Sequence, residues 1–359
     1  PSILAAHELN VDYPLESSSV GDATRRAAIH NWIDFLLSRL IEHVSFDRAS
    51  NKSYLVPHII GSLAQAALSD GIYASSRVAG WHYADSELAG GKQLSNIISR
   101  IGTDRQNKMF RKISKEFINI AAELGFFQSG YTYAADTTWI DWYGTDDKEY
   151  VIRNPEKCNT GEGWLFASVT IMSKDARFTI GNDIIQDKSN VIAGYKQFLA
   201  DVGRDYPING ICMDREFMSG DAIRMCRSIC DEWIIRAKQL KSGAIPEKLE
   251  QTPPRESYGP KPIEFASLDT QPKLYIHPLD PSDGIEASSD HMLFLVARCF
   301  GEGDGLKIYN TYQNRWSIES YFRQLKHQFS PKTKSNKETE RLFLIKAGSL
   351  FYNIHTLIN

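Results

Sequence analysis

Long apolar runs are missing from this sequence. No stretch reaches the roughly 18 consecutive apolar residues that a membrane-spanning helix needs, and no signal-peptide pattern opens the chain. We therefore expect no membrane partner and a cytoplasmic, nucleoid-associated location. The remaining composition is that of an ordinary globular protein, with 42% hydrophobic and 24% charged residues. The 359 residues leave room for two or three domains.

Cysteine is scarce and odd in number. The five cysteines are scattered along the chain at Cys158, Cys212, Cys226, Cys230 and Cys299. The spacing of Cys226 and Cys230 places two thiols on one helix face, but no second Cys pair or His pair completes a zinc set. The sequence therefore predicts buried, reduced cysteines rather than a metal centre.

A surplus of either charge is also absent, since the net charge is −3. Global basicity therefore does not indicate a nucleic-acid partner. Charge is nevertheless uneven along the chain. Residues 307–346 hold nine Lys and Arg against three Asp and Glu, and residues 100–115 hold six against one. Two basic segments on a near-neutral protein are typical of a DNA-binding protein whose metal site and remaining surface are acidic.

The C-terminal basic segment contains a helical pattern without Gly or Pro, YQNRWSIESYFRQLK, at residues 312–326. Apolar residues recur there at helical spacing and are expected to face a core: Ile318, Tyr321, Phe322 and Leu325. At about 100° per residue, five polar side chains share an arc of roughly 80°: Tyr312, Arg315, Glu319, Arg323 and Lys326. One carboxylate to hold a metal, flanked by cations to hold phosphates, is what a DNA-cutting site requires. The alternative is a solvated helix face on which Glu319 pairs with Arg315 and Arg323.

The chain from residue 22 to residue 128 has a helical pattern. Residues 1–21 lack periodicity and are expected to form a flexible arm, and residues 22–128 are expected to form an all-helical domain. Its last two helices are predicted at residues 94–101 and 105–124, with Thr103 or Asp104 as N-cap. Six cations accompany them: Arg100, Arg105, Lys108, Arg111, Lys112 and Lys115. These helices fit either a helix-turn-helix reader of DNA or a helical bundle with a charged outer face.

Strand patterns begin at residue 130. Residues 131–136 are rich in β-forming side chains and end on Asp136, and strands predicted at 163–172 and 177–180 complete an antiparallel meander. Three further acids compete with Asp136 for a role at this strand end, but they lie in polar loop sequence: Asp141, Asp146 and Asp147.

A helix, a strand, a second helix and another strand are predicted next, at residues 189–202, 208–213, 220–230 and 233–237. The strand at 208–213 ends on Asp214. This β-β-β-α-β-α-β order is the plan of the ribonuclease H-like fold, an α/β class with a mixed sheet flanked by helices. In that plan the first and fourth strands lie side by side, so we expect Asp136 and Asp214 to meet.

Residues 239–290 contain eight of the fourteen prolines and two short β-like pieces, at 263–266 and 273–276. We interpret this segment as an insertion within a catalytic domain formed by residues 129–238 and 291–359. A proline-rich surface loop is an equally good description. A strand at 291–299, a helix starting at residue 304 or 305 and a last helix at 338–358 complete the chain.

Four residues at fixed spacing, Tyr312, Arg315, Glu319 and Lys326, with Trp316 and Ile318 between them, resemble the YREK signature. That signature marks DDE transposases of the insertion sequence 4 family. The resemblance implies two more acids upstream, in D-x-T and D-R-G-F contexts. Asp136-Thr137-Thr138 fits the first context, and Asp214-Arg215-Glu216-Phe217 fits the second except that Glu216 replaces Gly. This extra carboxylate either perturbs metal binding or marks a divergent branch.

The expected chemistry is metal-dependent DNA cleavage and strand transfer. Asp136, Asp214 and Glu319 are expected to be both catalytic residues and ligands of two Mg²⁺ ions, for which Mn²⁺ substitutes. Four side chains are expected to bind DNA phosphates: Tyr312, Arg315, Arg323 and Lys326. The resemblance implies a cut-and-paste transposase that acts on terminal inverted repeats and target DNA, as a homodimer on the DNA ends, with residues 239–290 covering the active site. The alternatives are a nuclease of the same fold without strand transfer, and a non-catalytic DNA-binding regulator.

Overall fold

The computed structural model describes most of the chain after residue 90. The described residues are 91–126, 131–143, 150–153, 156–172, 177–185, 191–240, 242–253, 255–265, 268–279, 291–329 and 337–358, with Arg39, Leu63 and Ser335. The predictions for the arm at 1–21, for the helices before residue 91 and for Asp146 and Asp147 lie outside these residues.

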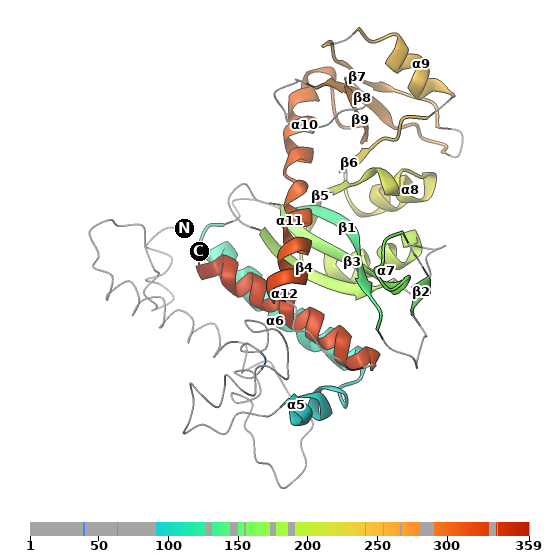
Figure 1. The fold of residues 1–359 in the computed structure, drawn as a ribbon. Coiled ribbons are helices and arrows are strands. Elements are labelled where there is room, and N and C mark those ends of the chain that lie inside the picture. Colours follow the sequence, from blue (N-terminus) through green and yellow to red (C-terminus); the bar gives the residue numbers. More distant parts are fainter. Residues whose placement is uncertain are drawn as a thin grey trace, which may run out of the picture.

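Within the described residues, nine strands form one sheet in the order β2-β3-β1-β5-β6-β9-β8-β7, and β4 pairs with β3 (Figure 1). The strands are β1 (Tyr131–Asp141), β2 (Ile152–Arg153), β3 (Glu162–Met172), β4 (Arg177–Ile184), β5 (Ile208–Met213), β6 (Glu232–Arg236), β7 (Tyr258–Pro262), β8 (Lys273–Pro278) and β9 (His291–Val296). β5 runs parallel to β1 and to β6, whereas the other strand pairs are antiparallel. The predicted meander is confirmed as β1, β3 and β4, and β1 lies beside β5 as expected.

Helices cover both faces of this sheet (Figure 1). They are α5 (Gly91–Ile98), α6 (Thr103–Glu123), α7 (Val191–Gly203), α8 (Gly220–Ile229), α9 (Ala244–Glu250), α10 (Gly305–Gln313), α11 (Trp316–Gln324) and α12 (Glu338–Ile358), with short turns η2 (Arg215–Phe217), η4 (Glu302–Asp304) and the π-helical η5 (Leu325–Phe329). The strand predicted at 208–213 and the last helix at 338–358 have the predicted bounds.

The alternation of side chains along β1 decides which face each residue occupies. Tyr133 and Ala135 pack into the core that also holds residues of α7 and α8, whereas Ala134 packs with Ile318 of α11. Asp136 follows Ala134 by two residues. Its side chain therefore lies on the face of the sheet that α11 covers.

The helix α6 packs against β4 and lies beside α12 (Figure 1). It begins at Thr103, and its N-cap is Gly102, which makes no side-chain capping bond. The predicted N-cap at Thr103 or Asp104 is therefore wrong, because both residues already lie within the helix. The predicted break between two helices near residue 102 is confirmed.

Part of the N-terminal basic segment is engaged in surface ion pairs. Arg111 lies 3.5 Å from Asp201 of α7, and Lys115 lies 3.1 Å from Asp205 just after that helix. These two cations join α6 to the sheet unit. Both side chains keep exposed fractions, 37% for Arg111 and 47% for Lys115.

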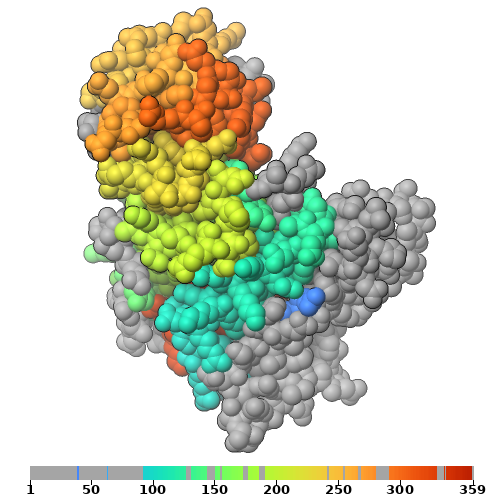
Figure 2. All heavy atoms as spheres, turned by 180° about the vertical axis from the view of Figure 1, so that it is seen from behind, coloured from blue at the N-terminus to red at the C-terminus, as the bar shows by residue number. Residues whose placement is uncertain are grey.

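The segment 239–290 extends the sheet rather than forming a plain surface loop. β8 pairs with β9 over six residues, and β7 pairs with β8 at the edge. The strand predicted at 273–276 is confirmed within β8. The one predicted at 263–266 is wrong because β7 ends at Pro262, and an edge strand tolerates the prolines at 260 and 262. Figure 2 shows these yellow and orange residues at the upper end of the molecule, above the yellow-green helices α7 and α8.

The cysteines and the apolar helices can be compared with the sequence predictions. All five cysteines are free, and all but Cys299 are buried. None of the helices in the described ranges combines the length and apolarity that crossing a bilayer demands.

Candidate active site

The parallel pairing of β1 with β5 brings two acids together. Ala135 lies opposite Met213, and each is followed directly by an acid, Asp136 or Asp214. β5 ends at Met213, and Asp214 turns away from the sheet as the N-cap residue of η2. The two carboxylates therefore start from adjacent strands at the same level of the sheet.

Asp136 does not end its strand, so that part of the prediction is wrong. β1 continues to Asp141 because β3 pairs with it as far as Gly163. At about 3.3 Å per residue, Asp141 lies roughly 17 Å beyond Asp136 along β1. Its carboxylate accepts hydrogen bonds from the backbone and side-chain nitrogens of Asn159, at 3.0 and 2.7 Å. The prediction that Asp141 lies in a loop is also wrong, since it is the last residue of β1, half-buried and bonded to Asn159.

The predicted single helix over residues 312–326 is divided into three pieces. Tyr312 lies at the end of α10, Glu319 lies in α11, and Lys326 lies in the π-helical η5. Arg315 sits at the junction of α10 and α11. A Cβ atom on Gly348 of α12 would lie 2.7 Å from the carbonyl oxygen of Phe329, so this glycine permits the close approach of η5 to α12.

One buried guanidinium group joins the three acids. The side chain of Arg315 is 1% exposed, with Nη1 lying 3.1 Å from Oδ2 of Asp136. Its Nη2 lies 2.8 Å from Oε1 of Glu319 and 3.9 Å from Oδ1 of Asp214. Three carboxylates from two strands and one helix, far apart in the sequence, therefore meet at one point.

Tyr312 completes this arrangement from the end of α10. Its side chain is fully buried, and its hydroxyl donates a hydrogen bond of 3.2 Å to Oδ1 of Asp214. The guanidinium carbon of Arg315 lies 5.1 Å from the centre of the Tyr312 ring, within the range of a cation–π contact.

Burial has the largest effect on the pKa of Asp136. It raises the pKa of Asp136 to about 7, against the lowering effects of Arg315 and of the Thr137 backbone N–H. Burial disfavours the charge of Arg315, but Tyr312 and the three carboxylates together raise its pKa, so it stays a cation. Asp136 is thus a carboxylate whose charge needs positive partners in order to persist at neutral pH.

An open cleft of about 380 Å³ lies beside these carboxylates. Its lining includes the three acids and two of the predicted phosphate ligands, Arg323 and Lys326. Glu216, the departure from the D-R-G-F context, also lines it, together with three residues that had no predicted role: Trp139, Lys157 and His327. His327 adjoins the signature, and Trp139 shares β1 with Asp136, so both carried a positional signal. Lys157 lies in a loop and carried none.

The residues predicted to bind phosphates thus fall into two groups. Arg323 and Lys326 are exposed and line the cleft. Tyr312 and Arg315 are buried and bonded to carboxylates, so neither side chain is open to DNA in this arrangement. Glu216, the departure from the family pattern, is exposed in η2 and lies 3.9 Å from the ammonium of Lys157.

The three carboxylates are oxygen donors of the type that Mg²⁺ and Mn²⁺ prefer. Asp136 in particular is buried with a raised pKa, as expected for an acid that requires a nearby cation. As they are placed, no group of three His, Cys, Asp or Glu side chains among the described residues closes around one ion. Arg315 holds them instead. The carboxylate oxygens fit a divalent metal ion, and the positive charge that lies between the acids in this structure is the guanidinium of Arg315.

Comparisons with known proteins concern the family and the fold of the chain. No curated protein matches the chain. The chain is similar to the cryo-EM structure of a piggyBac transposase synaptic complex with hairpin DNA, with a TM-score of 0.53 and 13% identity over 92% of this chain and 72% of that chain. At this identity the similarity concerns the fold. Residues 131–351, more than half of the sequence, match the family described as the transposase DDE domain. The chain therefore belongs to the DDE transposase domain family.

Proposed function

We propose that this protein is a transposase that cuts the ends of a DNA element and joins them to target DNA, with Asp136, Asp214 and Glu319 as its catalytic acids. The observation that carries the proposal is the meeting of these three carboxylates around Arg315 at one edge of an open cleft. The strand order β4-β3-β1-β5-β6, with β1, β5 and β6 parallel, supports a ribonuclease H-like core.

The same three acids would hold Mg²⁺, or Mn²⁺ in its place. When bound, two such ions supply an activated attacking oxygen and a stabilised leaving oxygen for phosphoryl transfer. The protein contributes the fixed placement of the acids. The side chain of Asp136 is 17% exposed, whereas that of Glu319 is about half exposed at the cleft.

Basic side chains of the cleft hold the DNA backbone. Arg323, Lys326 and His327 follow one another along α11 and η5, and Lys157 faces them from the loop before β3. Such side chains fix the position of a phosphate beside the acids without reading its sequence. Glu216 lies beside Lys157 and partly offsets the positive charge at this side of the cleft.

Arg315 has a different role from the one that its place in the signature implies. Its guanidinium neutralises the repulsion among three acids and keeps them assembled when DNA is absent. Tyr312 supports this role through its bond to Asp214 and its ring contact with Arg315. Membership of the insertion sequence 4 family rests on the YREK spacing, which the chain retains in full.

A nuclease of the same fold without strand transfer is the second candidate, because the acids alone suffice for cleavage. A passive DNA-binding regulator is disfavoured, since three acids and their counter-ion have no evident use in binding phosphates. The partners that we propose are the terminal inverted repeats, the target DNA and a second copy of this chain on the DNA ends.

The test is a cleavage and joining assay on a plasmid that carries the DNA flanking the gene. Mn²⁺-dependent nicking at an element end, followed by joined product in a target plasmid, supports the transposase. Nicking without joined product identifies the nuclease. Binding without nicking identifies the regulator.

A further inference from the structure

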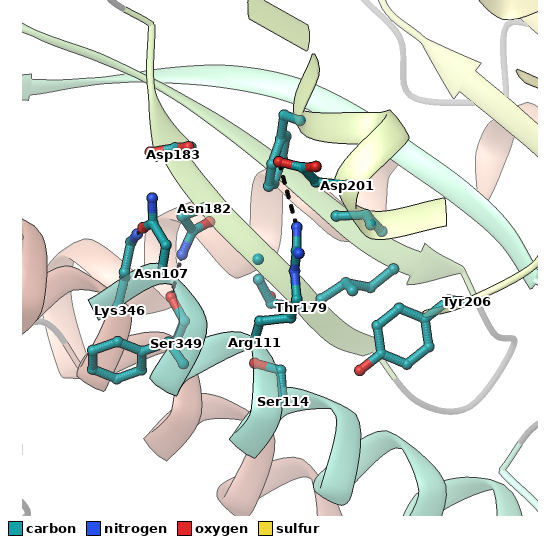
Figure 3. A pocket seen from close by; sticks show the side chains of 15 residues that line it. Asn107, Arg111, Ser114, Thr179, Asn182, Asp183, Asp201, Tyr206, Lys346 and Ser349 are labelled. Carbon is teal, nitrogen blue, oxygen red and sulfur yellow. Dashed lines mark hydrogen bonds and ion pairs between the residues drawn. The ribbon is translucent and has the colours of Figure 1, made fainter. Parts of the chain in front are cut away.

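Four polar side chains form a buried cluster next to the site, which we call the hydroxyl–amide cluster: Ser168, Asn182, Tyr321 and Ser349. Tyr321 is fully buried, and its hydroxyl lies 3.0 Å from Nδ2 of Asn182 and 2.8 Å from Oγ of Ser349. Asn182 also bonds the hydroxyls of Ser168 and Ser349. Figure 3 shows Asn182 and Ser349 joined at one side of a small pocket between α6, α12 and β4.

The cluster lies in the same row of the sheet as a catalytic acid. Asp136 of β1 pairs with Ser168 of β3, and Ser168 pairs with Asn182 of β4. Directly opposite residues of antiparallel strands point to the same face, so the three side chains share the face that α11 covers. From the opposite face, the hydroxyl of Tyr195 accepts a bond from the Ser168 backbone N–H and donates to the carbonyl of Asp136.

On the helix side, the cluster is bonded to the element that carries Glu319. Tyr321 follows Glu319 by two residues in α11, so the two side chains leave the helix on opposite faces, one towards the cleft and one into the core. The apolar neighbours Ile318 and Phe322 pack without directional preference. The hydroxyl of Tyr321 instead requires defined partners, because an unpaired buried polar group is costly.

We propose that the hydroxyl–amide cluster sets the position of Glu319 relative to Asp136, which makes Tyr321 a positioning residue of the site. The bonds from Tyr321 to Asn182 fix how far α11 slides and turns over the sheet row that contains Asp136. The inference rests on the proposed function, since it concerns the same three acids.

The test removes the hydroxyl and keeps the ring, in Tyr321→Phe. Mn²⁺ binding to the full chain without DNA is measured by electron paramagnetic resonance titration, together with nicking and DNA affinity. We expect the Mn²⁺ affinity and the nicking rate constant each to fall about tenfold, which is the usual effect of removing a group that orients a metal ligand. The DNA affinity should stay within about twofold of wild type. Tyr352→Phe is the matched control, because its ring lies 4.9 Å from that of Tyr321 in the same apolar core but outside the cluster.

A second measurement separates positioning from general loosening of the core. Ser349→Ala and Tyr321→Phe act on one bonded unit, so the double variant is expected to bind Mn²⁺ about as weakly as the weaker single variant. Wild-type Mn²⁺ affinity in Tyr321→Phe, or an equal loss in Tyr352→Phe, would overturn the inference while leaving the transposase proposal intact. Wild-type protein that neither binds Mn²⁺ nor nicks DNA would instead overturn the proposed function.

Discussion

The guanidinium of Arg315 lies 3.1 Å from the carboxylate of Asp136, and the two groups are nearly hidden from solvent. The same guanidinium also reaches Glu319 and Asp214. A buried cation shared by three acids is a structural requirement, because removing it leaves several negative charges uncompensated in a low-dielectric site.

Arg315→Met should therefore reduce the free energy of unfolding by roughly 3–5 kcal/mol in the absence of metal. Mn²⁺ should restore much of that loss, since it supplies the missing positive charge. Urea unfolding with and without Mn²⁺ measures both effects. Arg224→Met is the control, because Arg224 pairs with Asp221 on the exposed surface of α8, where such pairs contribute at most about 1 kcal/mol. Equal Mn²⁺ effects on Arg315→Met and wild type would refute the counter-ion role.

Lys326→Ala should weaken DNA binding through loss of a single phosphate contact. The slope of log affinity against log salt concentration should then become shallower by about one, with little change in stability. Lys238→Ala serves as the control, because Lys238 is an exposed cation outside the cleft. Titrations at several salt concentrations give the slopes, and an unchanged slope for Lys326→Ala would place this lysine outside the DNA path.

The two candidate acids on β1 can be separated by equivalent substitutions. Asp136→Asn should abolish nicking, because this carboxylate contacts Arg315 beside the cleft. Asp141→Asn should leave the nicking rate within about twofold, since Asp141 is bonded to Asn159 instead. Single-turnover nicking assays compare the variants. A large loss in Asp141→Asn would show that the first acid of the site has been misassigned.

Lys346 of α12 provides a prediction about pH. Burial lowers its pKa to about 8, with Asp183 raising it and Arg111 lowering it, and its ammonium donates to Asn107. Between pH 8 and 10.5 the unfolded chain binds a proton that the folded chain lacks, so this lysine makes stability rise with pH across that window.

Lys346→Met should therefore raise the free energy of unfolding at pH 7 by about 2 kcal/mol. Relief of the unfavourable buried charge contributes roughly 3 kcal/mol, and loss of the hydrogen bond to Asn107 costs about 1 kcal/mol. The gain should shrink between pH 8 and 10. Urea unfolding at pH 7 and pH 9.5 measures it, with the exposed Lys196→Met as control. A gain that does not change with pH would contradict the assignment.

The sequence was sufficient to predict the elements whose limits are set locally. β5 and α12 have the predicted bounds, because an apolar strand closed by an acid and a long run of helix-forming residues without Pro are specified by adjacent residues. The pairing of β1 with β5 followed from strand order. The meeting of Asp136 and Asp214 was therefore predictable without coordinates.

Features that depend on distant charges were not predictable in this way. The segment 312–326 contains neither Gly nor Pro, yet it breaks between α10 and α11, where Arg315 contacts acids from β1 and from the end of β5. Helical periodicity placed Tyr312 and Arg315 on a polar surface stripe, whereas both are buried. The pairing of Arg315 with Glu319, four residues later, was predictable from helical spacing, but the Asp partners of Tyr312 and Arg315 lie about 100 residues or more earlier, which no local pattern records.

The most direct test of the central claim is Mg²⁺-dependent nicking by Asp214→Asn beside wild type, with DNA binding measured on the same samples. Asparagine keeps the size of the side chain and can still accept the bond from Tyr312, but it lacks the charge that a metal ion requires. Binding should persist or tighten, because it rests on cationic contacts to phosphate. We expect nicking to fall by at least about a hundredfold while binding is retained. Nicking near the wild-type rate in Asp214→Asn would contradict it.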